Sequence, residues 1–482
     1  MKENFGYIEK DKRKNILLLC DDIRMHSGIA TMAKEIVIGT AHHFNWFNVG
    51  AAVNHPDAGK ILDISGDVNK LASIDDADVK VMPYNGYGDS TLIRGLTNHF
   101  DFDAVFIFTD PRYWVWLFEI EREIRSKMPI FWLNIWDDYP APMYNRNYYD
   151  SVDVLMAISK QTKNINELVL GEKASTKHIS YIPHGINENM FYPITEGHEQ
   201  YEGLKDFKKS LLPIEDPEFV VFYNSRNIHR KHPADTILAY RLFCDMIGEE
   251  KAKKCAMIMH TQAVDQNGTD LRAVKEALTD PSYVNIYFSQ DKISTSQLNL
   301  LYNVSDVTML LTSNEGWGLS LTESLMAGKM IVANVTGGMQ DQMRFVDEKG
   351  KWIDFTPDFP SNHRGTYKEC GEWAIPVFPS NISLAGSVPT PYIFDDRVDL
   401  EDAAKALLQA YNLGKEERDR RGKAGREWVL SEEAQMSAKN MCKNVLNNMH
   451  IGFDKFTPRP YYEIFKAEAR PSKQVKHKLT GY

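Results

Sequence analysis

The sequence predicts an α/β protein made of two consecutive domains, each a parallel sheet covered by helices on both faces. Three observations predict this class. Short apolar runs alternate with stretches of helical periodicity, the pattern restarts after a polar segment near the middle, and 482 residues exceed one ordinary core. Strands that are apolar throughout are typical of a parallel sheet buried on both faces.

The first domain is predicted over residues 1–195. A strand at 16–20 and a helix at 29–38 begin the alternation. Polar or turn residues bound each apolar run, as expected of buried strands. The remaining strands of this domain are predicted at 104–108, 130–135, 154–158 and 178–182.

A polar, charged segment with prolines at 213 and 217 predicts a linker over 196–217, with one short helix. The second domain is predicted over 218–450. Its strands are predicted at 219–223, 256–260, 284–288, 307–311 and 330–334, and its helices at 235–243, 319–327, 399–411 and 415–430.

Residues 350–394 interrupt the second domain with a segment rich in Pro, Gly, Ser and aromatic residues. Because this stretch is too long for an ordinary connection, we interpret it as an inserted functional loop or cap near a site. The tail over 451–482 contains prolines at 458, 460 and 471. We expect it to be partly extended and to pack back on the first domain.

Composition excludes several classes of protein. Hydrophobic residues make up 43% and charged residues 25%, which is typical of a globular chain. A net charge of -10 argues against coating nucleic acid by charge alone. The five cysteines form no C-x-x-C pair, so we expect no disulfide framework or zinc site and a protein of the reducing cytoplasm. No apolar run approaches the roughly 18 residues that a membrane span needs.

The segment from Ser313 to Glu323 lies where a predicted strand runs into a helix. Gly316 and Gly318 let a ligand approach the backbone, and the first helical turn favours an anion such as a diphosphate. Glu315 can then reach sugar hydroxyls, and Glu323 the hydroxyls of a ribose. The alternative is that Glu315 caps the helix and Glu323 is solvated.

A second polar segment, from Asn224 to His232, follows the strand at 219–223. Arg226 supplies a planar guanidinium and Lys231 a compact charge, a combination suited to the two phosphates of a nucleotide sugar. Positive charge here would stabilise the departing diphosphate. The alternative is an ordinary basic surface turn.

These motifs resemble the retaining glycosyltransferases of family four, which have the GT-B fold. That family has an Arg and a Lys five residues apart, a Glu-x7-Glu signature and a Gly-Gly turn, matched by Arg226 with Lys231, Glu315 with Glu323, and residues 337–338. Segments 156–159 and 181–187 are similar to its domain-closing segments. The resemblance implies two Rossmann-like domains facing across a cleft and transfer from a nucleotide-diphosphate sugar, by default a UDP-sugar, with retention.

The same resemblance implies a role for each matching residue. Arg226 and Lys231 would bind the diphosphate, while Glu315 would contact the donor sugar and Glu323 the ribose. The remaining donor-site residues would be Gly316, Trp317, Gly318 and Leu319 through the backbone, Ser27 and Gly28 from the first domain, and Ser289 in a base-reading loop. No metal and no other cofactor is expected, because fixed positive side chains do that work.

The sequence departs from the family at three places. The family has a His after a first-domain strand that reaches the sugar, whereas this chain has Ile135, Trp136, Asp137 and Asp138 there. We therefore assign Asp137 to the catalytic set in place of that His. His184 stands where the family commonly has Asn, and residues 350–394 have no counterpart.

The acceptor is not predicted from the sequence beyond a glycan or small molecule, and the oligomeric state is not predicted. Aromatic residues at 114–149 are expected to be mostly core, and acidic pairs at 76–78 and 101–103 to be turn residues instead of metal ligands. Basic clusters at 12–14, 418–426 and 466–478 are either solvated faces or contacts to a phosphate-rich acceptor. A loose likeness to phage-encoded glycosyltransferases adds hydroxymethylated DNA as one alternative; a sugar-nucleotide epimerase and a non-catalytic binding protein are the others.

Overall fold

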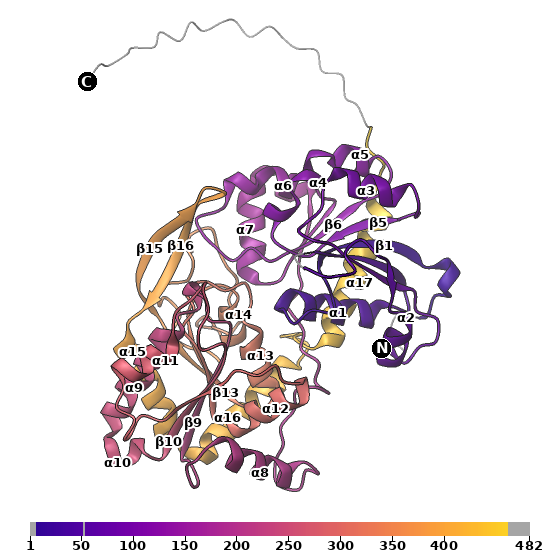
Figure 1. Cartoon of the computed structure of the whole chain (residues 1–482). Helices are drawn as coiled ribbons and strands as arrows, with labels where there is room; N and C mark the ends of the chain where they lie inside the picture. The colour runs from indigo at the N-terminus through magenta and orange to yellow at the C-terminus, as the bar shows by residue number, and fades with distance from the viewer. Residues whose placement is uncertain (1–5, 52–53, 461–482) are drawn as a thin grey trace, which may run out of the picture.

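The chain folds into two α/β domains that lie side by side (Figure 1). The computed structural model describes residues 6–51 and 54–460. Each domain contains one sheet with helices on both faces, so the predicted α/β class is confirmed.

The first sheet has eight strands in the order β3-β4-β2-β1-β5-β6-β7-β8, all parallel except β3. Its strands are β1 (Lys14–Asp21), β2 (Phe44–Ala51), β3 (Leu62–Asp63), β4 (Val79–Pro83), β5 (Ala104–Ile107), β6 (Ile130–Asn134), β7 (Val154–Ala157) and β8 (His178–Tyr181). All five predicted strands are present.

Three strands of this sheet were not predicted: β2, β3 and β4. Polar residues interrupt the apolar pattern of β2, yet the structure buries one of them, Asn48. Its side chain accepts a hydrogen bond from the Ile23 backbone N–H and donates one to the Leu18 carbonyl, so burial leaves it satisfied.

The helices of the first domain follow its strands. They are α1 (Gly28–Thr40), α2 (Ser65–Ala72), α3 (Ser90–Thr97), α4 (Val115–Glu119), α5 (Glu121–Arg125), α6 (Arg146–Asp150) and α7 (Lys160–Leu170). Ser27 caps α1 by accepting a hydrogen bond from the backbone N–H of Ala30, which fixes where this helix begins.

The second sheet has six parallel strands in the order β11-β10-β9-β12-β13-β14. Its strands are β9 (Phe219–Asn224), β10 (Cys255–His260), β11 (Ile286–Ser289), β12 (Val307–Leu310), β13 (Met330–Asn334) and β14 (Ala374–Val377). Its helices are α9 (Pro233–Ile247), α10 (Glu249–Ala252), α11 (Leu271–Leu278), α12 (Thr295–Val304), α13 (Leu319–Met326), α14 (Met339–Met343), α15 (Leu400–Asn412) and α16 (Gly414–Val429).

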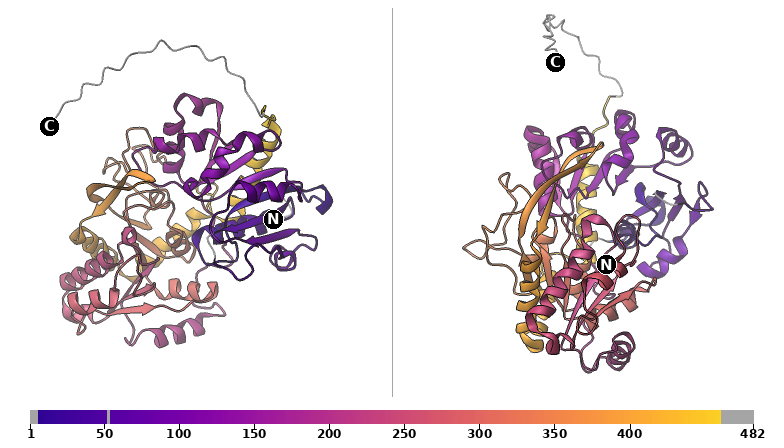
Figure 2. Two further views of the ribbon diagram at one scale, coloured as in Figure 1. Left: turned by 45° about the horizontal axis from the view of Figure 1, so that its top comes forward. Right: turned by 60° about the vertical axis from the view of Figure 1, so that its left-hand side comes forward.

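The segment 350–394 is not a single irregular loop. It contributes β14 to the edge of the second sheet and then most of an antiparallel hairpin, β15 (Pro379–Ser387) and β16 (Thr390–Val398). The hairpin rises from the second domain towards the first (Figure 2). The backbone N–H of Phe394 donates a hydrogen bond to the carbonyl of Tyr139, which joins the hairpin to the first domain.

Two segments connect the domains. One contains helix α8 (Tyr201–Leu211), in the predicted linker, and the other leads into α17 (Ala438–Lys455). Helix α17 packs on α1 and β7, so the chain is back on the first domain by residue 438, earlier than the expected return at 451. Residues 461–482, which include most of the predicted extended tail and the basic cluster at 466–478, lie outside the described residues.

Most charged clusters that the sequence left open have structural partners. Arg13 is buried and pairs with Asp76, and Arg418 is buried and pairs with Asp306. Asp103 accepts a hydrogen bond from the backbone of Asn15. Four of the five cysteines are buried and all five are free. Within residues 6–51 and 54–460, no helix has the length and apolar character needed to cross a membrane.

Candidate functional site

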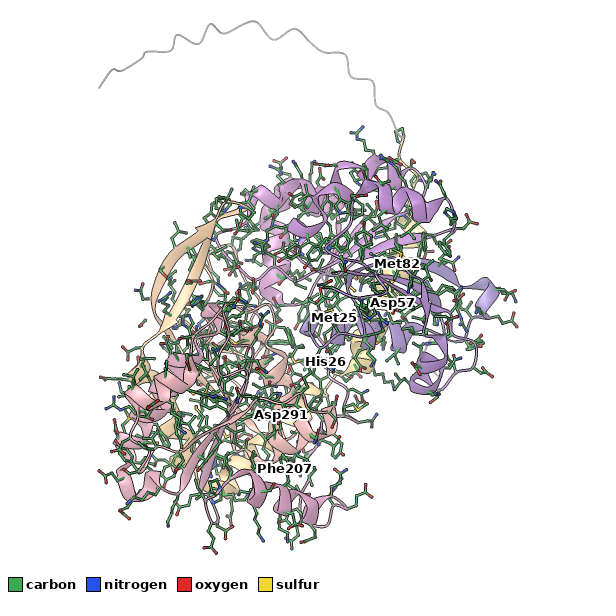
Figure 3. The ribbon with its side chains drawn as sticks, viewed as in Figure 1. Met25, His26, Asp57, Met82, Phe207 and Asp291 are labelled. Atoms are coloured by element: carbon green, nitrogen blue, oxygen red, sulfur yellow. The ribbon has the colours of Figure 1, made fainter. Side chains whose placement is uncertain are left out.

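A cavity of about 1440 Å³ lies between the two domains, at the carboxyl ends of both sheets. Residues that follow β1, β5, β6 and β8 line it from the first domain, and residues that follow β9, β10, β11 and β12 line it from the second. Figure 3 labels His26 and Asp291 on the facing sides of this cleft, one from each domain. Ligands of parallel α/β sheets bind at this edge.

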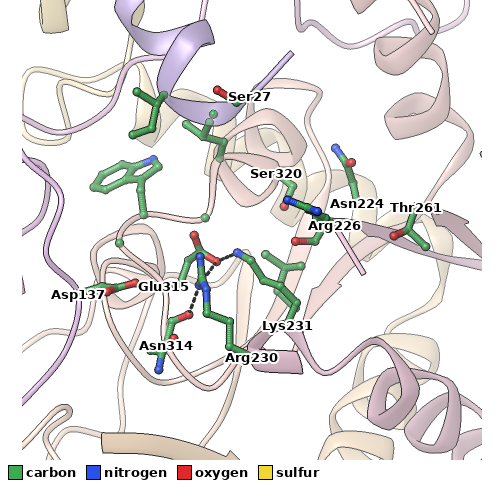
Figure 4. A pocket seen from close by; sticks show the side chains of 18 of the residues that line it. Ser27, Asp137, Asn224, Arg226, Arg230, Lys231, Thr261, Asn314, Glu315 and Ser320 are labelled. Carbon is green, nitrogen blue, oxygen red and sulfur yellow. Dashed lines mark hydrogen bonds and ion pairs between the residues drawn. The ribbon is translucent and has the colours of Figure 1, made fainter. Parts of the chain in front are cut away.

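An ion pair between Lys231 and Glu315 lies in the wall of the cavity (Figure 4). Lys231 ends the short 3-10 turn His229–Lys231 after β9, and Glu315 lies in the loop after β12. The two side chains are 11% and 13% exposed, so the pair is largely shielded from water. The Arg230 guanidinium lies 3.5 Å from the same carboxylate oxygen and donates a hydrogen bond to the Asn314 carbonyl.

Burial shifts the protonation equilibrium of Lys231. It lowers the pKa of this ammonium well below its usual value, Arg230 lowers the pKa further, and the Asp137 carboxylate opposes both. Direct contact with the Glu315 carboxylate also favours the charged form. A polyanion entering the cavity would add negative charge beside Lys231 and hold its proton more firmly.

A double-glycine turn holds the Glu315 loop in place. The backbone N–H of Gly338 donates a hydrogen bond of 2.9 Å to the Glu315 carbonyl. A Cβ at Gly337 would overlap that carbonyl oxygen, and Gly337 has a φ of +56°, so only glycine fits there. Helix α13 begins after Gly318 and has no side-chain cap, which rules out the alternative that Glu315 caps it.

Glu323 also lies in the cavity wall, on helix α13, which follows the Glu315 loop. Its carboxylate accepts a hydrogen bond of 2.6 Å from the Tyr302 hydroxyl, which itself accepts one of 2.9 Å from the Asn224 amide. Burial raises the pKa of Glu323 to about 7, and the bond from Tyr302 partly opposes the shift. Glu323 is therefore part-buried and hydrogen-bonded, not freely solvated.

Arg226 also lines the cavity, but it does not contact the Lys231–Glu315 pair. Its side chain is 64% exposed, and its guanidinium lies 3.2 Å from a carboxylate oxygen of Asp265. Arg230 is the arginine that reaches Glu315. The sequence did not single out Arg230, although it lies next to Lys231, because spacing does not show which side chains of a turn point inward.

The first domain meets the second at the start of α1. The hydroxyl of Ser27 donates to the Asp21 carboxylate, so two roles fix this side chain: the bond to Asp21 and the cap of α1. A Cβ at Gly28 would lie 3.2 Å from the Leu319 side chain of the opposite domain. Gly28 and Leu319 therefore close one end of the cavity, and Ser27 lies beside them.

Asp137 and Asp138 line the cavity from the loop after β6. Asp137 faces Gly316, where an added Cβ would lie 3.9 Å from the Asp137 Cβ. Burial, followed by the negative charge of Asp137, raises the pKa of Asp138 well above its usual value. One carboxyl oxygen of Asp138 is buried and has no hydrogen-bond partner among the described residues.

Three further residues have distinct surroundings. Trp317 is 2% exposed and its indole N–H donates to the Thr322 hydroxyl, so its side chain is structural. His184 packs edge-on against Trp317, and burial lowers its pKa to about 3. Ser289 ends β11 beside His260, with Nδ1 and Oγ 3.0 Å apart, and both residues line the cavity.

No family model matches the chain, and no curated protein matches its sequence. Solved structures do match its fold. A glycosyltransferase from Rickettsia africae is 14% identical, with 92% of this chain and 100% of that chain covered and a TM-score of 0.60. Anabaena HepE, solved in complex with UDP-glucose, is 11% identical over 91% and 99% of the two chains, with a TM-score of 0.62. A sucrose-phosphate synthase from Thermosynechococcus elongatus is 14% identical over 92% and 100%, with a TM-score of 0.61.

The fold is GT-B. Two Rossmann-like domains facing across a cleft were predicted from the sequence, and the structural neighbours confirm this fold over more than nine-tenths of the chain. The GT-B cleft of this protein brings together Lys231, Glu315 and Glu323 from one domain and Asp137 from the other. Among residues 6–51 and 54–460, no group of three or more His, Cys, Asp or Glu side chains could hold a metal ion.

Proposed function

We propose that this protein is a retaining glycosyltransferase that moves a sugar from a nucleotide-diphosphate sugar, a UDP-sugar by preference, to an acceptor hydroxyl. The observation that carries the proposal is the largely shielded Lys231–Glu315 pair at the carboxyl ends of β9 and β12, with Glu323 on the next helix. HepE, which has this fold, is described with UDP-glucose bound.

Each side chain suits one part of such a donor. The Lys231 ammonium and the Arg230 guanidinium supply positive charge for the diphosphate, with Arg226 on the exposed rim. The Glu323 carboxylate suits the two hydroxyls of a ribose. Glu315 suits hydroxyls of the transferred sugar, since its carboxylate lies beside the phosphate-binding cation.

Transfer requires one bond to form and one to break at the anomeric carbon. The acceptor oxygen forms the new bond, the bond to the diphosphate oxygen breaks, and the acceptor proton passes to the departing diphosphate. Negative charge grows on that diphosphate in the transition state, and fixed cations stabilise it there without reorganisation. Lys231 is therefore assigned the main catalytic role, while Asp137 faces the transferred sugar from the opposite domain.

A two-step experiment tests this proposal. Thermal unfolding is first measured with a panel of nucleoside diphosphates and their sugars, since a ligand at 100 times its Kd stabilises the native state by about 2.7 kcal/mol. The stabilising donor is then incubated with acceptors, and the anomeric configuration of the product is read by NMR. A product with the donor's configuration supports the proposal, whereas inversion contradicts it.

The same experiment separates the competing functions. An epimerase would change the sugar of the donor without any acceptor. A non-catalytic binding protein would be stabilised by the donor but would release no nucleotide with any acceptor. Transfer to hydroxymethylated DNA would be seen as sugar incorporated into the DNA.

A further inference from the structure

The cavity is larger than one ligand needs. Pockets for single small ligands commonly enclose about 300–1,000 Å³, whereas this cavity encloses about 1440 Å³. The proposed donor residues Lys231 and Glu323 line it from the second domain. The loop containing Asp137 and Asp138 and the hairpin β15–β16 line the cavity as well.

One face of the hairpin is turned to this space. On β15 the lining residues include Ala385 and Ser387, and on β16 they are Thr390, Ile393, Asp395 and Arg397. Alternate residues of a strand point to the same face, and Ala385 pairs directly with Ile393. Leu384, the residue directly before Ala385, does not line the cavity and is 67% exposed. The hairpin therefore has a distinct cavity-facing side.

The hairpin is held in position from both domains. The Tyr144 hydroxyl donates a hydrogen bond of 3.2 Å to the Tyr392 carbonyl, and the two rings pack edge-on. On the other side, the Asn314 amide donates a hydrogen bond of 3.1 Å to the Asp395 carboxylate. Asn314 directly precedes Glu315, so the hairpin is connected to the loop that carries the buried ion pair.

We propose that the cavity-facing side of hairpin β15–β16 forms one wall of the acceptor subsite and that this subsite takes a neutral, hydroxyl-rich acceptor. The inference rests on the proposed glycosyltransferase function and adds the acceptor class to it. Near its tip the lining residues of the wall are Ala385, Gly386, Ser387 and Thr390, none of which carries a charge. Such a surface suits a sugar or polyol and offers no partner for a charged group.

Two arginines at this space are each paired with a carboxylate. Arg112 is held by Asp110, with N–O distances of 2.5 and 2.9 Å, and Arg397 lies 3.8 Å from Asp395. A phosphate entering here would lie beside these carboxylates and the Asp137 carboxylate, and like charges repel. Carboxylate oxygens do accept hydrogen bonds from hydroxyls, and the Asp137 side chain lines this space.

Two neighbouring substitutions test the wall. Ala385→Arg places a charge on the cavity-facing side, whereas Leu384→Arg places the same charge on the exposed face. Both proteins are assayed with UDP-glucose as donor and with glucose, maltose, glycerol, glucose 6-phosphate and glucosamine as acceptors, by release of UDP. We expect the neutral acceptors to accelerate release in the wild type, and Ala385→Arg to reduce that acceleration at least tenfold while Leu384→Arg leaves it unchanged.

Calorimetry with UDP-glucose distinguishes the possible failures. Wild-type protein that does not bind UDP-glucose or any other nucleotide sugar would contradict the proposed function itself. If the donor binds with equal affinity to all three proteins, the acceptor assay decides the inference alone. Equal responses from the two variants would overturn the hairpin wall. Acceleration by glucose 6-phosphate or glucosamine only, or by no neutral acceptor, would overturn the acceptor class.

Discussion

Lys231 and Glu315, which are 84 positions apart in the sequence, form a shielded ion pair at the carboxyl ends of two adjacent strands, β9 and β12. A buried ion pair costs desolvation energy that its own attraction does not always return. The pair lies in the wall of a large cleft, and under the proposed function a second anion, the diphosphate, would use Lys231 from the open side.

The first prediction concerns Lys231. Lys231→Ala should reduce kcat by about 10²–10³-fold, because one fixed cation that stabilises the departing diphosphate is lost. UDP release under saturating donor measures this effect. Lys405→Ala, at an exposed position on α15 where Lys405 pairs only with Asp402, is the matched control and should retain full activity. Near-normal turnover of the Lys231 variant would remove the residue from the catalytic set.

The second prediction concerns Asp137, which faces the Glu315 loop from the other domain. Asp137→Asn keeps the shape of the side chain and removes its charge. We expect kcat to fall while the affinity for UDP-glucose changes little, because the residue lies opposite Gly316, in the other domain from Lys231 and Glu323. Steady-state kinetics together with calorimetry separate these two effects. Loss of donor affinity without loss of kcat would assign Asp137 to donor binding alone.

The third prediction concerns the protonation of Glu323. Its folded-state pKa is raised to about 7 from 4.5, so the native state holds the proton to higher pH than the unfolded chain does. This carboxyl therefore lowers the stability of the fold as the pH rises from about 4.5 through about 7. Ribose hydroxyls need the carboxylate form, so donor binding should change in the opposite direction.

UDP-glucose binding should strengthen about tenfold from pH 6 to pH 8, because the deprotonated fraction of Glu323 rises from about one-tenth to about nine-tenths. Both phosphates of this donor are esterified, so the donor itself does not titrate in this range. Calorimetry at several pH values measures the effect. Glu323→Gln is the control and should give a flat profile; an unchanged slope in that variant would show that another group titrates.

The fourth prediction concerns the glycine turn. Gly337→Ala should destabilise the fold by about 1–3 kcal/mol, because the added Cβ would overlap the Glu315 carbonyl and the backbone has a positive φ. Donor affinity should also fall, since the Glu315 loop must move. Gly66→Ala, where nothing lies within 4 Å of the added Cβ, should leave both the melting temperature and the affinity intact.

The fifth prediction concerns metal ions. Activity should survive a chelator such as EDTA, and added Mg²⁺ should not increase it, because Lys231 and Arg230 supply the positive charge at the diphosphate. Rates measured with and without the chelator check this. A loss of activity that Mg²⁺ restores would assign the ion a part in donor binding.

Local patterns in the sequence predicted the fold well and the site in part. The apolar strands β1 and β9 and the helices after them were readable, because both faces of these strands are buried. Strand β2 was missed because its buried Asn48 finds partners only in the folded chain. The hairpin β15–β16 was missed because its exposed strands carry no apolar alternation.

The site residues followed a similar rule. Lys231, Glu315 and Glu323 were found through their spacing in one domain, and they do line one cavity. Arg230 and the Tyr302 bond to Glu323 were not found, since side-chain direction and contacts between elements are set by packing. Asp138 and the hairpin wall depend on the two domains meeting, which no local pattern describes.

The measurement that most directly tests the central claim is a crystal structure of this protein with UDP-glucose bound. The account predicts density in the cleft between the domains, with the diphosphate beside Lys231, the ribose on Glu323 and the glucose against Glu315. Nucleotide bound outside that cleft, or bound within it without contact to Lys231 and Glu323, would contradict the account.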